Sequence, residues 1–146
     1  MQIDRKRLSF FYLTIALVAL VGTWGNNLAY LERGVLGGNV AFWRDTFANP
    51  ASRSITADIF LLALAVIVWM FPEARRLGMR MAWLYVLQGL LVAISVTIPI
   101  FLFNRELALT RLAPQDTAGN LSRSDLAWIA LQAMTAVACT VSTFLR

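Results

Sequence analysis

Long stretches without a charged side chain are the feature that most constrains how this chain can fold. Residues 8–31 and 81–104 each run for 24 positions with no Asp, Glu, Lys or Arg, and residues 126–145 run for 20. A helix needs about 20 apolar residues to cross the roughly 30 Å hydrocarbon core of a bilayer. We expect the first run to be a retained helix rather than a signal peptide, because no small-x-small cleavage site follows it.

A fourth apolar stretch, residues 54–72, differs from these runs because it contains a carboxylate, Asp58. A charge at the centre of a bilayer costs about 2.5–3.5 kcal/mol on insertion scales, and less near a helix end. Asp58 lies near the start of the stretch, and Pro72 is expected to end it. The sequence therefore predicts an all-α polytopic membrane protein that forms one domain, residues 1–146. Its four crossings are predicted at about residues 8–30, 54–72, 81–104 and 126–145.

The composition supports lipid as the main solvent and excludes several kinds of chemistry. Hydrophobic residues make up 59% of the chain and charged ones 14%, whereas soluble proteins average roughly 45–50% and 25%. The net charge of +5 comes from basic residues in loops and at helix ends, which indicates membrane topology and lipid headgroups rather than nucleic acid. With no histidine and a single cysteine, Cys139, we expect no disulfide within the chain, no metal site and no cofactor.

The loop between the first two crossings is predicted to contain a short helix that lies flat at the membrane interface. Glycines break the first crossing, and Asn39 is placed to cap a helix over residues 39–48. Apolar side chains in that segment fall at helical spacing, as in an interfacial helix. Ser52 or Ser54 then caps the second crossing. In the third crossing, Pro99 is expected to bend or break the helix near its far end.

The placement of Lys and Arg favours a topology with both termini on the inner, cytoplasmic side of the membrane. Four crossings with the N-terminus inside put seven Lys and Arg on the inner side and six on the outer side. The inner residues are more densely packed against helix ends, as inner-side charges usually are. The turn between the second and third crossings holds Arg75, Arg76 and Arg80, which we interpret as a topology signal or a lipid-headgroup site. Glu73 precedes Arg76 by three residues, a spacing that allows a local ion pair.

Four crossings also predict a polar cluster at the outer ends of three helices. The second crossing begins there with Asp58, and the third ends there with Glu106. Asp58 and Glu106 are therefore candidate catalytic residues, since a desolvated carboxyl can serve as a proton donor. The alternative is structural: Asp58 lies near a helix N-terminus, which favours a carboxylate, and could pair with an arginine. The candidate ligand-binding residues at this level are Asn26, Asn27, Tyr30, Asn104 and Arg105.

The fourth crossing has its own start signal and its own packing face. Ser122 with Asp125 three residues later predicts a capping box at its N-terminus. Small residues recur every fourth position along it, a pattern that favours close approach of another membrane helix. The predicted packing residues are Thr135, Ala136, Cys139 and Thr143.

Two motifs in the first three crossings resemble a family of small bacterial membrane proteins that is known only as a domain of unknown function. They are E-A-R-R-L-G at residues 73–78 and P-x-F-L-x-x-R-E at residues 99–106. The resemblance covers roughly residues 8–110 and implies a membrane fold without an assigned reaction. It also implies a location in the inner membrane of a bacterium. The chain departs from it at Asn26 and Asn27, where a proline is expected, and its fourth crossing lies beyond the shared region.

A weaker similarity connects the chain with the membrane-protein family required for plant neoxanthin formation. It rests on the order of an acid-bearing helix, an Arg-Arg-Leu-Gly turn, Trp83 and a proline-containing helix that ends in Arg. This similarity would imply an isomerase or cyclase that acts on an isoprenoid or carotenoid, with Asp58 as the acid.

Three classes of function remain open from the sequence. We favour an accessory or scaffold subunit of a membrane complex, because the chain has no nucleotide-binding loop, no metal-ligand cluster and no histidine. The alternative is a membrane enzyme or carrier for an apolar isoprenoid-like lipid, and the third is a transporter or channel component. The expected partners are the bilayer and either a larger membrane protein or such a lipid.

Overall fold

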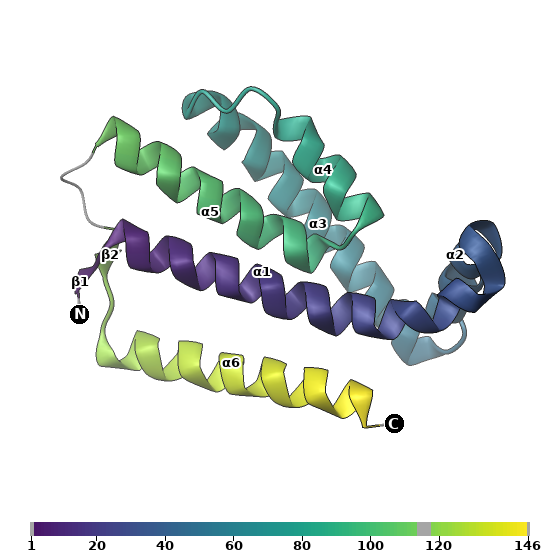
Figure 1. Cartoon of the computed structure of the whole chain (residues 1–146). Helices are drawn as coiled ribbons and strands as arrows, with labels where there is room; N and C mark the ends of the chain where they lie inside the picture. Colours follow the sequence, from purple (N-terminus) through teal and green to yellow (C-terminus); the bar gives the residue numbers. More distant parts are fainter. Residues whose placement is uncertain (1, 114–117, 146) are drawn as a thin grey trace.

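The computed structural model describes residues 2–113 and 118–145, and this part of the chain is predominantly helical (Figure 1). Arg146, one of the predicted inner basic residues, lies outside the described residues. The elements in chain order are β1 (Gln2–Ile3), α1 (Arg5–Asn27), the 3-10 helix η1 (Leu28–Arg33), α2 (Gly34–Thr46), α3 (Pro50–Arg76), α4 (Ala82–Leu91), α5 (Ile94–Leu112), β2 (Gly119–Asn120) and α6 (Arg123–Phe144).

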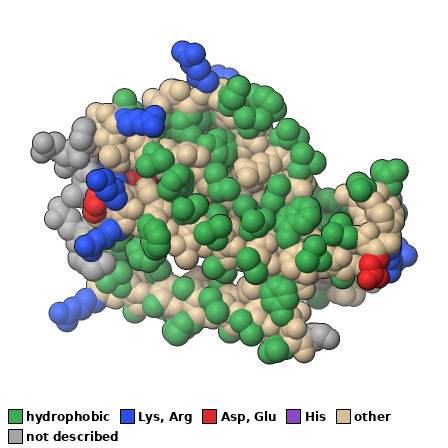
Figure 2. Space-filling view, viewed as in Figure 1, with side chains coloured by type: hydrophobic (Ala, Val, Ile, Leu, Met, Phe, Trp, Pro, Cys, Tyr) green, Lys and Arg blue, Asp and Glu red, His purple; other side chains and the backbone are tan. Residues whose placement is uncertain are grey.

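Three helical stretches among the described residues are long and apolar enough to cross a membrane: Arg5–Thr46, Pro50–Arg76 and Arg123–Phe144. They correspond to the first, second and fourth predicted crossings. Figure 2 shows hydrophobic side chains over the middle of the molecule, with most Lys and Arg gathered toward the end where α1 begins. The all-helical class is therefore confirmed, and these helices could cross a membrane.

The third predicted crossing, residues 81–104, is not one helix. The helix stops at Leu91, Ala93 is extended with φ −176° and ψ 143°, and the chain reverses into α5. Helix α4 has 10 residues, so it rises about 15 Å, roughly half of a hydrocarbon core. The prediction failed because an uncharged run records the length of apolar sequence but not its direction, and neither Val92 nor Ala93 signals a turn.

The reversal exposes a backbone carbonyl that a neighbouring helix satisfies. The indole Nε1 of Trp24, on α1, donates a hydrogen bond to the carbonyl oxygen of Val92 at 3.2 Å. An unpaired carbonyl inside hydrocarbon would cost several kcal/mol, so this contact stabilises the turn. Pro99, the predicted site of the break, instead lies inside α5, and the helix continues on both sides of it.

The ends of α3 also differ from the prediction. Asn49 rather than Ser52 or Ser54 is the N-cap, and its side chain accepts from the backbone N–H of Ser52 at 2.9 Å. Pro50 then occupies the first helical position, where its missing N–H is no loss. At the other end the helix continues past Pro72 to Arg76. The motif E-A-R-R-L-G thus begins in the last turn of α3 rather than in a loop.

The helix predicted over residues 39–48 begins and ends earlier in the structure. Helix α2 begins at Gly34, five residues before the expected cap at Asn39, and ends at Thr46. Gly34 has φ 70° and is the C-cap of η1, so a glycine does end a helix there, as predicted. Gly38 lies inside α2, where a Cβ would collide with the carbonyl oxygen of Tyr30, so this glycine lets α2 fold tightly against η1. At the last helix, the predicted capping box of Ser122 and Asp125 is confirmed.

Helix α1 lies at the centre of the arrangement, antiparallel to α5 on one side and parallel to α6 on the other (Figure 1). The buried core between α3, α4 and α5 contains Met70, Ala74, Ala82 and Phe101. The seam between α1 and α6 depends on two glycines. A Cβ on Gly22 would lie 2.8 Å from Cγ2 of Thr140, so no larger residue fits there without a shift.

The two ends of the described chain lie at opposite ends of the helix layer (Figure 1). Strand β1 pairs with β2, which places the start of α6 beside the start of α1, and α6 then runs away with α1. The prediction that both termini share one side of the membrane was derived from four crossings, and the third of these is divided between α4 and α5. The orientation of the termini stays a prediction.

Candidate functional site

Five charged side chains from three helices form one network at the end of the molecule where α1 begins. Glu106 of α5 accepts from Arg5 Nη1 at 2.9 Å and from Arg105 Nη1 at 2.7 Å. Glu73 of α3 accepts from Arg105 Nε at 2.7 Å and from Arg76 at 2.8 Å. The charges alternate in sign along the network, and Arg105 connects the two carboxylates.

The two carboxylates of the network are largely removed from solvent, whereas Arg76 is exposed. Glu106 is 2% exposed and Glu73 is 9% exposed. A buried carboxylate is tolerated only when it is paired and hydrogen-bonded, because desolvation of an isolated charge costs several kcal/mol. Each of these acids has two guanidinium partners, which makes the bonds charge-assisted and short. The arrangement therefore ties α1, α3 and α5 together at one level.

Aromatic side chains also contact Arg105 and pack around it. Its guanidinium carbon lies 5.9 Å from the ring centre of Trp69, within the range of a cation–π interaction. The ring of Phe101 contacts Trp69 and Tyr85 edge-to-face, with centroid distances of 5.6 and 5.3 Å. Asn104 donates to the hydroxyl of Tyr85 at 2.9 Å. Residues of α3, α4 and α5 thus fix the position of Arg105.

The structure divides the polar cluster that the sequence predicted. Glu106, Asn104 and Arg105 lie with Arg5 at the charged end, because the reversal returns α5 to that end. Asp58 lies on the same straight helix as Glu73 but 15 residues earlier, which is about 22 Å along the axis. Asp58 and Glu106 therefore do not form an acid–base pair in this structure.

The other predicted ligand-binding residues stay at the far end of α1. Asn26 lies 21 residues beyond Arg5, about 31 Å along the helix, and its amide donates to Thr143 Oγ1 of α6 at 3.0 Å. Asn27 is half-buried at the last position of α1. Tyr30 donates to Asp45 at 3.0 Å, which holds α2 against η1. These side chains contact helices α2 and α6 or end α1, and none meets Glu106.

Asp58 itself lies exposed on the outer surface of α3, and no ion pair or hydrogen bond of its side chain is found in the described part of the chain. The alternative of a bond between Asp58 and an arginine is not seen among the described residues, and Arg105 pairs with Glu73 and Glu106. The pairing of Asp58 with Glu106 assumed that α5 would end near Asp58, whereas α5 returns to the charged end.

Of the predicted inner basic residues and the predicted packing residues of α6, some make contacts within the chain and the others do not. The ion pair between Glu73 and Arg76 is formed, whereas Arg75 and Arg80 are exposed. On α6, Thr143 contacts α1 through Asn26. The other three predicted packing residues, all exposed, are Thr135, Ala136 and Cys139.

Sequence reasoning missed the contacts that join distant parts of the chain. Arg5 and Glu106 are 101 residues apart, and Trp24 and Val92 are 68 apart. No spacing rule connects such residues. The available signal was the opposite charge of Glu73, in the first motif, and Arg105, in the second.

Comparison with known proteins agrees with the resemblance read from those motifs. The chain matches the model of a family described as protein of unknown function DUF2834 over residues 11–107. The chain belongs to this family. The family match contains both motifs, and it ends in α5, so α6 lies beyond it. No curated protein and no solved structure matches the chain.

Proposed function

We propose that the protein is an accessory or scaffold subunit of a membrane complex, and that α6 is the helix that contacts the partner. The observation that carries this proposal is the open flank of α6. Across Arg123–Phe144 no residue is buried, although the helix is apolar. Its contacts with the rest of the chain run along the seam with α1, where Thr140 and Thr143 meet Gly22 and Asn26.

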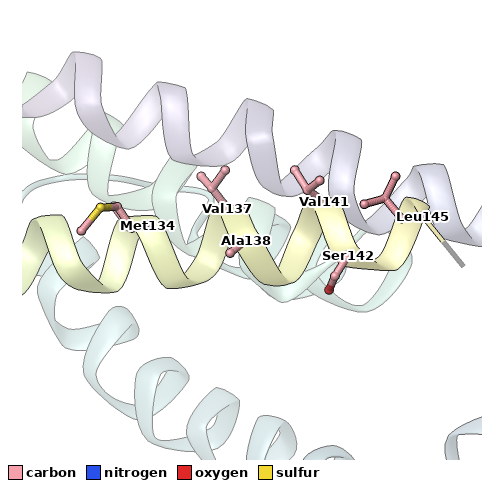
Figure 3. Close-up of a pocket in the computed structure, with 7 residues that line it drawn as sticks. Met134, Val137, Ala138, Val141, Ser142 and Leu145 are labelled. Atoms are coloured by element: carbon pink, nitrogen blue, oxygen red, sulfur yellow. The ribbon is translucent and has the colours of Figure 1, made fainter.

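Residues of α6 line a shallow, open apolar groove of about 630 Å³. Figure 3 shows Val137, Val141 and Leu145 on the side of α6 toward α1 and Ser142 on the opposite side, with the small Ala138 between them. Small and β-branched residues in this order suit a second membrane helix, because packing between helices in lipid depends on close van der Waals contact. We propose an apolar helix of a larger membrane protein as the occupant.

The ionised groups support a structural role for the acids. Glu106 is buried between two arginines, and Asp58 is distant from it, so neither stands in the acid–base geometry that an isomerase would need. The similarity to the plant neoxanthin family, with an isoprenoid-like lipid as substrate, and the transporter hypothesis both stay predictions.

We further propose that the charged end faces the cytoplasm of a bacterium and that the C-terminus lies on the other side of its inner membrane. Three described basic residues lie at the far end of α1, namely Arg33, Arg44 and Arg53, whereas nine lie at the charged end. This bias is stronger than the one that four crossings gave, and basic residues concentrate on the cytoplasmic side. The nine are Arg5, Lys6, Arg7, Arg75, Arg76, Arg80, Arg105, Arg111 and Arg123.

Reporter fusions test this orientation. A reporter that is active only outside the cytoplasm is expected to be active when fused after α6 and inactive when fused before β1. If both fusions are expressed and inserted but neither is active, both ends lie in the cytoplasm and the number of crossings is even. That result would contradict the proposed orientation.

The docking proposal predicts a position-specific loss of the complex. Ala138→Leu fills part of the groove, so the protein purified from its own membrane in lipid discs is expected to lose its partner by native mass spectrometry. Cys139→Leu is the matched control, because Cys139 is exposed on the same helix and does not line the groove. Equal retention of the partner in both variants would contradict docking on this flank, and a wild-type protein without any protein partner would contradict the scaffold role.

A further inference from the structure

A second groove, of about 660 Å³, lies between α4 and the C-terminal half of α5. Its walls are apolar and include Leu84, Leu107 and Leu112. It opens at the charged end of the molecule, because Arg80 lies in the turn after α3 and Arg111 lies in the last turn of α5. A groove of this kind has an apolar body and a basic mouth.

The two arginines at this groove differ from those of the network. Arg5, Arg76 and Arg105 are each paired with a buried or partly buried acid. Arg80 and Arg111 are exposed, and neither pairs with an acid among the residues that the structure describes. Two unneutralised guanidinium groups therefore border one groove and create a local excess of positive charge.

Polar atoms inside the groove also have unused hydrogen-bonding capacity. The hydroxyl of Tyr85 accepts from Asn104, which leaves its own hydrogen free to be donated. The amide of Gln88 lines the groove and has no hydrogen-bond partner in the described part of the chain. The groove therefore has hydrogen-bond donors on Tyr85 and Gln88 in addition to the two arginines.

We propose that this groove binds an anionic phospholipid from the surrounding leaflet, with its phosphate between Arg80 and Arg111. Guanidinium groups form strong paired hydrogen bonds with phosphate oxygens. Basic pockets between membrane helices on the cytoplasmic side are a recognised kind of site for anionic headgroups. The leucines of α4 and α5 then contact the upper part of an acyl chain, and the Tyr85 hydroxyl and Gln88 amide donate to the ester region.

The occupant is a lipid rather than a free anion, because most of the lining is apolar and is continuous with the hydrocarbon level of α4. The proposal is independent of docking through α6, since the two grooves lie on different helices and at different faces of α1. A lipid bound there would fill the groove between α4 and the C-terminal half of α5.

The test uses the full chain in lipid discs that contain phosphatidylglycerol and phosphatidylcholine in equal amounts. After release into mild detergent, native mass spectrometry is expected to show phosphatidylglycerol retained in preference to phosphatidylcholine. The double variant Arg80→Gln, Arg111→Gln should retain it about tenfold less or lower still, given the usual strength of hydrogen bonds to charged groups. The conservative variant Arg80→Lys, Arg111→Lys should keep most of the preference.

The matched control is Arg33→Gln, Arg53→Gln, which removes the same charge at the other end of the molecule. Equal loss of phosphatidylglycerol in both double variants would overturn the proposal, because it would show a general effect of net charge. Equal retention of the two lipids by the wild type would also overturn it. Leu107→Gln gives a separate check: it leaves both arginines in place and should lower lipid retention, whereas binding of phosphate alone would be unaffected.

Discussion

Replacement of Glu106 by Gln is expected to destabilise the protein by about 3–5 kcal/mol, the usual cost of removing one partner from a buried ion pair. Glu106 is the shared acceptor of Arg5 and Arg105 and is 2% exposed. A neutral amide keeps the shape of the side chain but removes the negative charge that Arg5 and Arg105 share. The effect is measured by reversible unfolding in lipid discs or mixed micelles, followed by tryptophan fluorescence.

The control for this variant is Glu32→Gln, which removes an exposed acid at the other end of the molecule. Surface charges contribute roughly 0–1 kcal/mol, so Glu32→Gln should leave the unfolding midpoint almost unchanged. A double variant with Arg5→Gln should lose less stability than the sum of the two single variants, since the pair acts together. Strict additivity would contradict the ion pair between α1 and α5.

Truncation of Phe101 to Ala is expected to have an effect of similar size through a different cause. Phe101 is fully buried and packs with Met70, and its ring contacts Trp69 and Tyr85. Phe→Ala changes in a packed core typically cost about 3–5 kcal/mol, because the contacts are lost and a cavity remains. The same unfolding measurement reports the loss.

Phe10→Ala serves as the control for this truncation, because Phe10 is 68% exposed on the outer surface of α1. Removal of an exposed ring leaves no internal cavity, so a small change is expected. If Phe101→Ala unfolded at the wild-type midpoint, α3, α4 and α5 would not share the core described above. Phe101→Leu, which keeps most of the volume, should recover part of the lost stability.

The sequence predicted the helices well where each is a long apolar run with local signals. The start of α6 followed from its capping box at Ser122, and the ion pair of Glu73 with Arg76 followed from helical spacing. Such features depend on residues a few positions apart. Pro72 and Pro99 misled the interpretation, because proline weakens a helix locally but packed neighbours can keep it continuous.

The candidate site could not be placed from the sequence, because one reversal decides which end of the molecule α5 reaches. The turn at Val92 and Ala93 contains no Gly, Pro or polar residue, and Trp24 of another helix stabilises it. Once the chain turns there, Glu106 meets Arg5 instead of Asp58. A tertiary contact thus determined which residues form the site, and no local sequence pattern predicts that contact.

The bend between α4 and α5 is covered by another part of the protein. Helices α4 and α5 form a hairpin that turns at Val92 and Ala93, and Trp24 of α1 covers the turn through its hydrogen bond to the Val92 carbonyl. Non-helical backbone at membrane depth is tolerated where protein covers it and is costly where lipid does. Such a bend could therefore lie within a hydrocarbon layer without an unsatisfied carbonyl.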